Sequence, residues 1–351
     1  LPAVADQFAL IGAVDHAPDG SYREGDHGDD TLRMATGYFG KADAPGLLTL
    51  INRALGADAA APVAMIGARH FGIAPGDWLA HAPIELIYYQ MPDQPPNSGH
   101  PEVGQLLEDA LDQRFVERRR AQARGVLDSF RGTKEVMRKF GPLLADPVLK
   151  LNGNPDAEVD GITNAMLNEI GGTGDMHDER SLALALRLLQ LGSPAVALDL
   201  ESFDWHDNEA TEAPLRYPRF ARYLAGIHFA LSNIPDPLGG GSLLDTTLVV
   251  TTSEFGRTRA PGGFNEGAGT DHGNGPGWRY QGHVLFGGGI QPKVIAPTNN
   301  EHEPTAEFIS THSLLATVAC AVGTPLELVE EVWPSGSALY PEGEPLWQLW
   351  D

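Results

Sequence analysis

The sequence predicts an α/β fold with a largely parallel central sheet and helices on both faces. Short apolar runs alternate with segments of helical spacing along the chain, as in strands joined by helical crossovers. Runs such as "AVAL" (195–198) and "LVV" (248–250) are continuously apolar, as expected of strands that helices cover on both faces. With 351 residues, 42% of them hydrophobic, the chain can form one large core, so we expect a single domain over residues 1–351.

The elements of the first half follow from local patterns. Two segments carry apolar residues at helical intervals, and the second ends at a glycine, a common helix terminator. Short apolar runs closed by polar or turn residues predict strands. A longer charged segment can place its leucines on one face and its Glu-Arg-Arg-Arg run in water, which predicts a surface helix. The predicted helices are 29–40, 45–56 and 103–141, and the predicted strands are 8–16, 62–72 and 84–91.

The second half shows the same alternation more regularly. Its helical segments have clear apolar faces, and its strands are short and rich in valine and leucine. The stretches at 91–102 and 152–161 are rich in turn-forming residues and are expected to be loops within the domain. The predicted helices are 179–192, 215–234 and 310–323, and the predicted strands are 194–202, 246–256 and 282–289.

Charge and cysteine content exclude several classes of function. The chain has 24 Lys and Arg against 47 Asp and Glu, a formal charge of −23, so its field repels nucleic acid and anionic membrane surfaces and attracts cations. Its one cysteine, Cys320, can form neither an intramolecular disulfide nor a thiolate metal cluster. No apolar run is long enough to span a membrane. Metal ions are therefore the expected charged partners.

Polar side chains able to bind a metal follow the predicted strands of the second half. In an open parallel sheet, ligands collect beyond the carboxyl ends of the strands, where the following loops converge. A glycine-rich stretch at 262–275 would let the backbone fold tightly around a ligand. The candidates are Asp204 and His206 after the first of these strands, Glu254 and Arg257 after the second, Asp271 and His272 in the glycine-rich stretch, and His283 where a further strand is expected to begin.

Taken singly, each fragment has an ordinary explanation. An Asx turn or a helix N-cap accounts for Asp204, and an ion pair with Arg257 accounts for Glu254. Taken together, carboxylates and imidazoles at three strand ends predict a site for one or two divalent cations. Residue types alone do not choose among zinc, manganese, magnesium and calcium. Two such cations would polarise an ester oxygen and stabilise the entering and leaving oxygens in phosphoryl or sulfuryl transfer.

The motifs "ALDLESFDWHDN", "TTLVVTTSEFGRT", "GTDHGNG" and "HVLFGGGI", in this order, resemble those of an uncharacterised, usually exported bacterial family of the alkaline phosphatase/sulfatase-like superfamily. Members show a Phe-Asp-x-His, a Ser-Glu-Phe-Gly-Arg-Thr and a Thr-Asp-His-Gly motif. The segment "GDHGDDTLRMATGYF" near the amino terminus is similar to that family as well. The likeness covers nearly the whole chain.

The resemblance implies an alkaline phosphatase-like fold with a metal site at the carboxyl edge of the sheet. By this analogy, Asp204 and His206 bind one metal, Asp271 and His272 bind the other, and His283 is a further candidate ligand. Two more residues match the family motifs, and we infer their roles from their chemistry. We expect Glu254 to bind the metal or to orient a ligand, and Arg257 to bind a substrate oxyanion with its forked guanidinium. His27 in "GDHGDD" matches too and is a candidate catalytic residue, with a role in a helix-capping loop as the alternative.

The family comparison also bears on location and on the start of the chain. Family members are usually exported, which implies a periplasmic or extracellular protein. They carry a first strand whose loop supplies the nucleophile or its metal anchor, and this strand would precede Leu1. We therefore expect the chain to lack that strand and assign no nucleophile within it.

The expected function is that of a metal-dependent hydrolase acting on small anionic phosphate or sulfate esters. The alternative is a non-catalytic binding or assembly protein that retains the fold and binds a protein partner as part of a cell-surface complex. A nucleotide-binding oxidoreductase is disfavoured, because "FGGGI" (286–290) lacks the spacing of a dinucleotide-binding loop. The histidines outside the motifs are expected to be structural: His70, His81, His100, His177, His228, His302 and His312.

Overall fold

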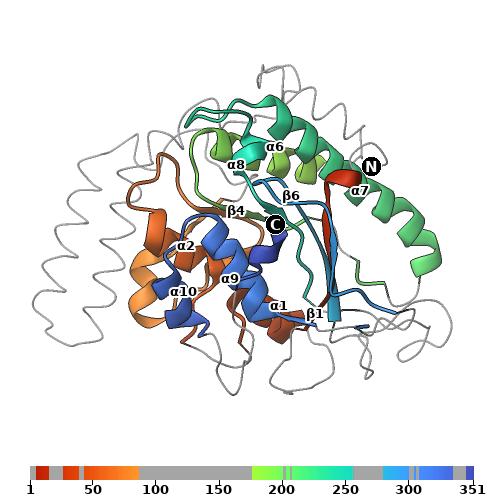
Figure 1. Cartoon of the computed structure of the whole chain (residues 1–351), viewed down its shortest axis with the longest axis horizontal. Helices are drawn as coiled ribbons and strands as arrows, with labels where there is room; N and C mark the ends of the chain where they lie inside the picture. Colours follow the sequence, from red (N-terminus) through yellow and green to blue (C-terminus); the bar gives the residue numbers. More distant parts are fainter. Residues whose placement is uncertain are drawn as a thin grey trace, which may run out of the picture.

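The protein is a mixed α/β structure with two sheets (Figure 1). The computed structural model describes residues 5–15, 27–38, 43–86, 176–200, 203–205, 208–254, 256, 280–299, 304–305, 308–334 and 345–351. The surface helix predicted over 103–141 and the loops predicted at 91–102 and 152–161 lie outside these residues.

The smaller sheet is entirely parallel and has helices on both faces. Strand β2 (Ala64–Ile66) lies between β3 (Ile84–Glu85) and β4 (Val196–Leu198). On one face, Ala64 and Ile66 pack in a core with α6 (Met176–Gln190) and α7 (Glu209–Asn233). On the other face, Met65 packs with the three helices α2 (Leu47–Leu55), α9 (Thr311–Ala321) and α10 (Leu326–Val332). The predicted layering is confirmed for this sheet.

The larger sheet is mixed, unlike the largely parallel sheet that the sequence predicted. Strand β6 (Tyr280–Phe286) runs antiparallel to both β1 (Ala9–Asp15) and β5 (Val249–Val250). Two short strands, β7 (Val294–Ile295) and β8 (Ile309–Ser310), pair with β1 in parallel. The sequence between β5 and β6 is rich in glycine and shows no helical crossover pattern. An antiparallel neighbour needs no such crossover, so strand-helix alternation was a poor guide here.

Element boundaries differ from the predicted ones mainly at the strands. The predicted strand at 62–72 is shorter and is followed by the 3₁₀ helix η2 (Arg69–Gly72). The predicted strand at 282–289 begins earlier, at Tyr280, so His283 lies inside β6 and not at its start. The remaining helical elements are α1 (His27–Thr36), α8 (Leu243–Thr246), η1 (Ala5–Gln7), η3 (Gly76–His81) and η7 (Trp347–Leu349). None of the described helices is both long and apolar enough to cross a membrane.

Two of the histidines expected to be structural are buried in the described core. His228 of α7 donates from Nε2 to Oε1 of Gln7 at 2.5 Å and packs against Phe8 and Phe286. Burial lowers the pKa of His228, which favours the neutral ring. His312 of α9 is fully buried as well. The structural assignment of these two histidines is therefore confirmed by their contacts.

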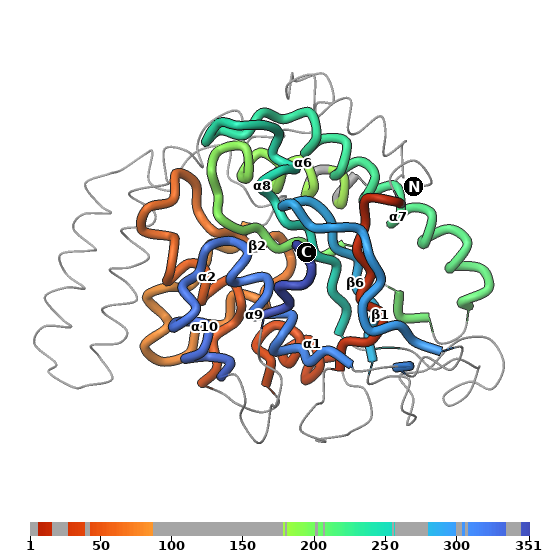
Figure 2. The backbone as a smooth tube through the Cα atoms, in the orientation of Figure 1, coloured from red at the N-terminus to blue at the C-terminus, as the bar shows by residue number. Residues whose placement is uncertain are grey.

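Three buried hydrogen bonds, which we call the α1 clamp, connect the end of α1 and the two residues after it to α9 and to the end of α10. His312 Nε2 donates to the Gly37 carbonyl at 2.6 Å, and Trp333 Nε1 donates to the Thr36 carbonyl at 2.7 Å. The Tyr38 hydroxyl donates to the Val332 carbonyl. In Figure 2, the backbone of α1 accordingly lies next to the beginning of α9. The clamp fixes the carboxyl-terminal end of α1, and His27 is the first residue at the opposite end of this helix.

Gly37 is the residue of the clamp that tolerates substitution least. Its φ is +80°, and a Cβ there would lie 2.5 Å from Cδ2 of His312. We expect Gly37→Ala to lower the free energy of unfolding by about 3 kcal/mol, because backbone strain adds to steric overlap. Gly323→Ala is the matched control, because its φ is +91° but the Cβ would meet no atom within 4 Å. That variant should lose only about 1 kcal/mol in chemical denaturation. Equal losses in the two variants would contradict the packing role of Gly37.

Candidate functional site

Three of the candidate residues meet at one place, although they are far apart in the sequence. His27 Nδ1 lies 3.0 Å from Oε1 of Glu254, which is 227 residues further along the chain. His27 Nε2 lies 3.1 Å from Oδ2 of Asp204, which is 177 residues away. The imidazole therefore bridges two carboxylates. Two residues that follow separate strands, Asp204 and Glu254, thus lie on either side of the His27 ring.

The topology of the larger sheet explains why His27 and Glu254 can meet. Strands β1 and β5 flank β6 and both run antiparallel to it, so their carboxyl ends lie at the same edge of the sheet. Glu254 follows β5, and α1, which begins at His27, is the first described helix after β1. The α1 clamp holds the far end of that helix. His27 is thus placed by a short helix whose opposite end is fixed in the core.

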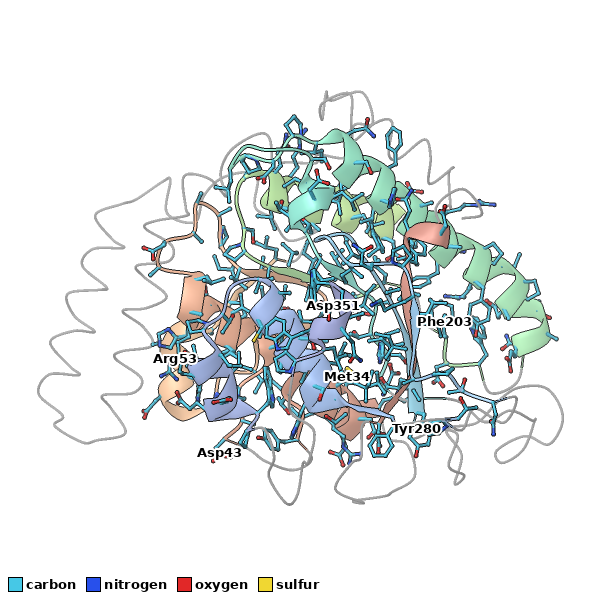
Figure 3. All side chains as sticks on the ribbon, viewed as in Figure 1. Met34, Asp43, Arg53, Phe203, Tyr280 and Asp351 are labelled. Carbon is cyan, nitrogen blue, oxygen red and sulfur yellow. The ribbon has the colours of Figure 1, made fainter. Side chains whose placement is uncertain are left out.

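Asp204 is positioned by the two aromatic residues on either side of it. Phe203, labelled in Figure 3, stacks on Tyr217 of α7 with ring centroids 5.2 Å apart, and it meets Phe220 edge-on at 5.7 Å. Trp205 is almost completely buried and meets Tyr217 edge-on at 5.7 Å. Both neighbours of Asp204 are therefore held against α7. This anchoring restricts the backbone that carries the carboxylate.

Strand β6 holds the segment that carries Glu254. Gln281 is 2% exposed, and its Nε2 donates to the backbone carbonyl of Glu254 at 2.7 Å. His283, equally buried, contacts the carbonyl of Thr251 through Nδ1 at 2.7 Å. A carbonyl only accepts, so Nδ1 of His283 carries the hydrogen and Nε2 is the ring atom with a lone pair when the ring is neutral. The predicted metal role of His283 stays a prediction, while its contact with Thr251 supports the loop after β5.

The hydrogen-bonding capacity of His27 does not match two carboxylate neighbours. A neutral imidazole carries one N–H, so it can donate to only one of Asp204 and Glu254. The other nitrogen then directs its lone pair at a carboxylate oxygen, unless the ring gains a second proton or a cation lies between the two atoms. Imidazole nitrogen and carboxylate oxygen are ligands that zinc and manganese both accept. The residue types of the cluster are thus among those that bind divalent cations.

The cluster is open to solvent. The side chain of His27 is 46% exposed, and those of Asp204 and Glu254 are 32% and 34% exposed. Screening by water makes such contacts weak as structural ion pairs. The three side chains are therefore accessible to a ligand and contribute little to folding.

The remaining candidates do not lie within the described residues. These are His206, Arg257, Asp271 and His272. Across the part of the chain that the structure describes, no group of three or more His, Cys, Asp or Glu side chains is arranged so that it could hold a metal ion. The described cluster alone is thus no full coordination site.

Sequence reasoning missed the residues that position the cluster. Gln281 and Tyr217 carry no motif signal, because their roles depend on contacts across the fold. Phe203 and Trp205 could have been noticed, since two large aromatic residues on either side of a candidate aspartate indicate a packed backbone.

Gln281 should support the site through the backbone of Glu254. Gln281→Met keeps the side-chain volume and leaves the Glu254 carbonyl without this donor, so we expect a loss of about 1–2 kcal/mol in the free energy of unfolding. Gln291→Met is the control, because Gln291 is exposed and its bond to the Gly289 carbonyl is long, at 3.4 Å. That change should stay within about 0.5 kcal/mol. Urea denaturation of both variants measures the difference, and equal stabilities would refute the role of Gln281.

Comparison with known protein families places the chain in one of them. The family model described as "Protein of unknown function (DUF1501)" matches residues 91–330, more than half of the chain. The matched range includes Asp204 and Glu254, whereas His27 precedes it. Searches among curated proteins and among solved structures found no match. The chain belongs to the family of proteins of unknown function DUF1501.

Proposed function

We propose that the protein is a metal-dependent hydrolase of phosphate or sulfate esters. The observation that carries this proposal is the exposed imidazole of His27 between the carboxylates of Asp204 and Glu254. Three residues from distant parts of the chain converge there, and their hydrogen-bonding capacities are mismatched in a way that a cation would relieve. Such clusters at the carboxyl edge of a sheet are a common form of active site in α/β proteins.

The roles of the three residues follow from the two ring nitrogens. Glu254 accepts a hydrogen bond from Nδ1–H of His27 and so fixes the tautomer of the ring. Nε2 then presents its lone pair beside Oδ2 of Asp204, and His27 and Asp204 would hold the cation. His27, first considered as a catalytic residue, thereby becomes a ligand, and Glu254 becomes the residue that orients it.

The motif residues outside the described part complete the proposed site. His206, Asp271 and His272 are the further ligands, and Arg257 binds the non-bridging oxygens of the ester through its planar guanidinium. Bound divalent cations would polarise the ester group and stabilise the charge on its oxygens. Zinc, manganese, magnesium and calcium are all compatible with this mixture of carboxylates and imidazoles.

The exposure of the cluster favours catalysis over a purely structural metal. Structural sites are closed by protein ligands, whereas catalytic sites keep a position open for water or substrate. About half of the His27 side chain is accessible, and a third of each carboxylate. A non-catalytic binding or assembly protein of a cell-surface complex has no need of an open cluster of this kind.

We further propose the alkaline phosphatase/sulfatase-like superfamily and an exported location for this chain. The order of the motifs supports the superfamily, and so do the parallel sheet and its helices on both faces. The location rests on the resemblance of the motifs to a usually exported family.

Turnover of simple esters tests the proposed activity. Wild-type protein should hydrolyse 4-nitrophenyl phosphate or 4-nitrophenyl sulfate when supplied with one of the four cations, and EDTA should abolish the reaction. His27→Ala should lower kcat/KM at least about 100-fold through loss of a ligand, and Glu254→Gln about 10–100-fold through loss of the orienting charge. His70→Ala, an exposed histidine in η2, should leave kcat/KM unchanged.

Two results would contradict the hydrolase. One is the absence of cation-dependent turnover of both esters by the wild type. The other is turnover that His27→Ala leaves intact. Either result would make the non-catalytic binding protein the better account of the cluster.

A further inference from the structure

We infer that Tyr217 forms a binding face for the organic group of the ester, and that this group contains a ring. The inference rests on the proposed hydrolase function and adds the substrate class to it. Tyr217 belongs to α7, whereas the reacting cluster is built from α1 and from the segments that follow β4 and β5. The face therefore comes from an element outside the cluster.

Tyr217 is connected to the cluster through the two residues on either side of Asp204. Tyr217 contacts both Phe203 and Trp205, and these two residues are the chain neighbours of Asp204. The aromatic contacts thus begin within one residue of the carboxylate that faces His27. An ester whose acidic group lies at the cluster would have its organic group at a short distance from this carboxylate, where the aromatic side chains lie.

The exposure of Tyr217 is unusual for a residue with two aromatic neighbours. Its relative exposure is 56%, while that of Trp205 is 7%. The segment 203–205 is also anchored by the edge-on contact of Phe203 with the partly buried Phe220. Stacking on Phe203 and an edge contact with Trp205 hold the Tyr217 ring in one orientation. A pre-oriented, exposed aromatic ring binds another ring at a low cost in side-chain entropy.

The same helix supplies a matched control. Leu215 is 61% exposed and lies two residues from Tyr217, and residues at this spacing do not share a face of a helix. Its truncation removes a similar exposed apolar group on the other side of α7. A general effect of surface hydrophobicity would appear in both positions, whereas a ring-binding face would appear only at Tyr217.

Calorimetric titration with acids that are not hydrolysed tests the inference apart from turnover. Phenyl, cyclohexyl and methyl acids are compared, each as the phosphonate and as the sulfonate, on cation-loaded protein. The wild type should bind the phenyl acid about fivefold more tightly than the methyl acid, a preference typical of one aromatic contact. Tyr217→Phe and Leu215→Ala should keep the preference. Tyr217→Ala should abolish it, and so should Tyr217→Leu, which preserves apolar bulk if the alanine variant fails to fold.

Each outcome decides between the possibilities. A preference for the phenyl acid alone supports an aryl ester, and an equal preference for the cyclohexyl acid supports a saturated ring such as that of a sugar. Equal binding of phenyl and methyl acids by the wild type overturns the inference and leaves the proposed function standing. A preference for the phenyl acid that survives in Tyr217→Leu has the same consequence. Failure of every acid to bind overturns the ring-binding face and contradicts the proposed function as well.

Discussion

The contact of one imidazole with two carboxylates is the constraint on which the site depends. As a neutral ring, His27 can donate a hydrogen bond to only one of Asp204 and Glu254, and we propose that a cation accounts for the second contact. The protein places this contact at an exposed edge and keeps the supporting hydrogen bonds in the core. Stability and the proposed chemistry are thereby assigned to different residues.

Each member of the cluster has its own support within the fold. The α1 clamp fixes the helix that begins at His27, Gln281 of β6 holds the backbone of Glu254, and aromatic contacts with α7 hold the residues beside Asp204. These supports come from both faces and from the middle of the larger sheet. A rigid frame of this kind suits a site whose ligand atoms must keep their relative positions.

The sequence predicted helices better than strand arrangement. Helices such as α2, α6 and α9 show an apolar periodicity over several turns, and the structure has them within a few residues of their predicted ends. The direction of β6 was not predictable, because local composition does not distinguish an antiparallel strand from a parallel one. Strands β7 and β8 have two residues each, too few for any periodic signal. For the site, motifs identified Asp204, Glu254 and His27, but their contacts join residues at least 177 positions apart in the chain. The roles of Gln281 and Tyr217 depend on tertiary contacts that no local pattern indicates.

The metal content of the purified protein tests the central claim most directly. Protein prepared without chelators and analysed by inductively coupled plasma mass spectrometry should contain about one or two divalent ions per chain. His27→Ala should lose at least one of them, because the ring nitrogen beside Asp204 is a proposed ligand, and His70→Ala should retain the wild-type content. A wild-type protein that binds no metal even after incubation with zinc, manganese, magnesium or calcium would contradict the account, and so would a His27→Ala variant with unchanged metal content.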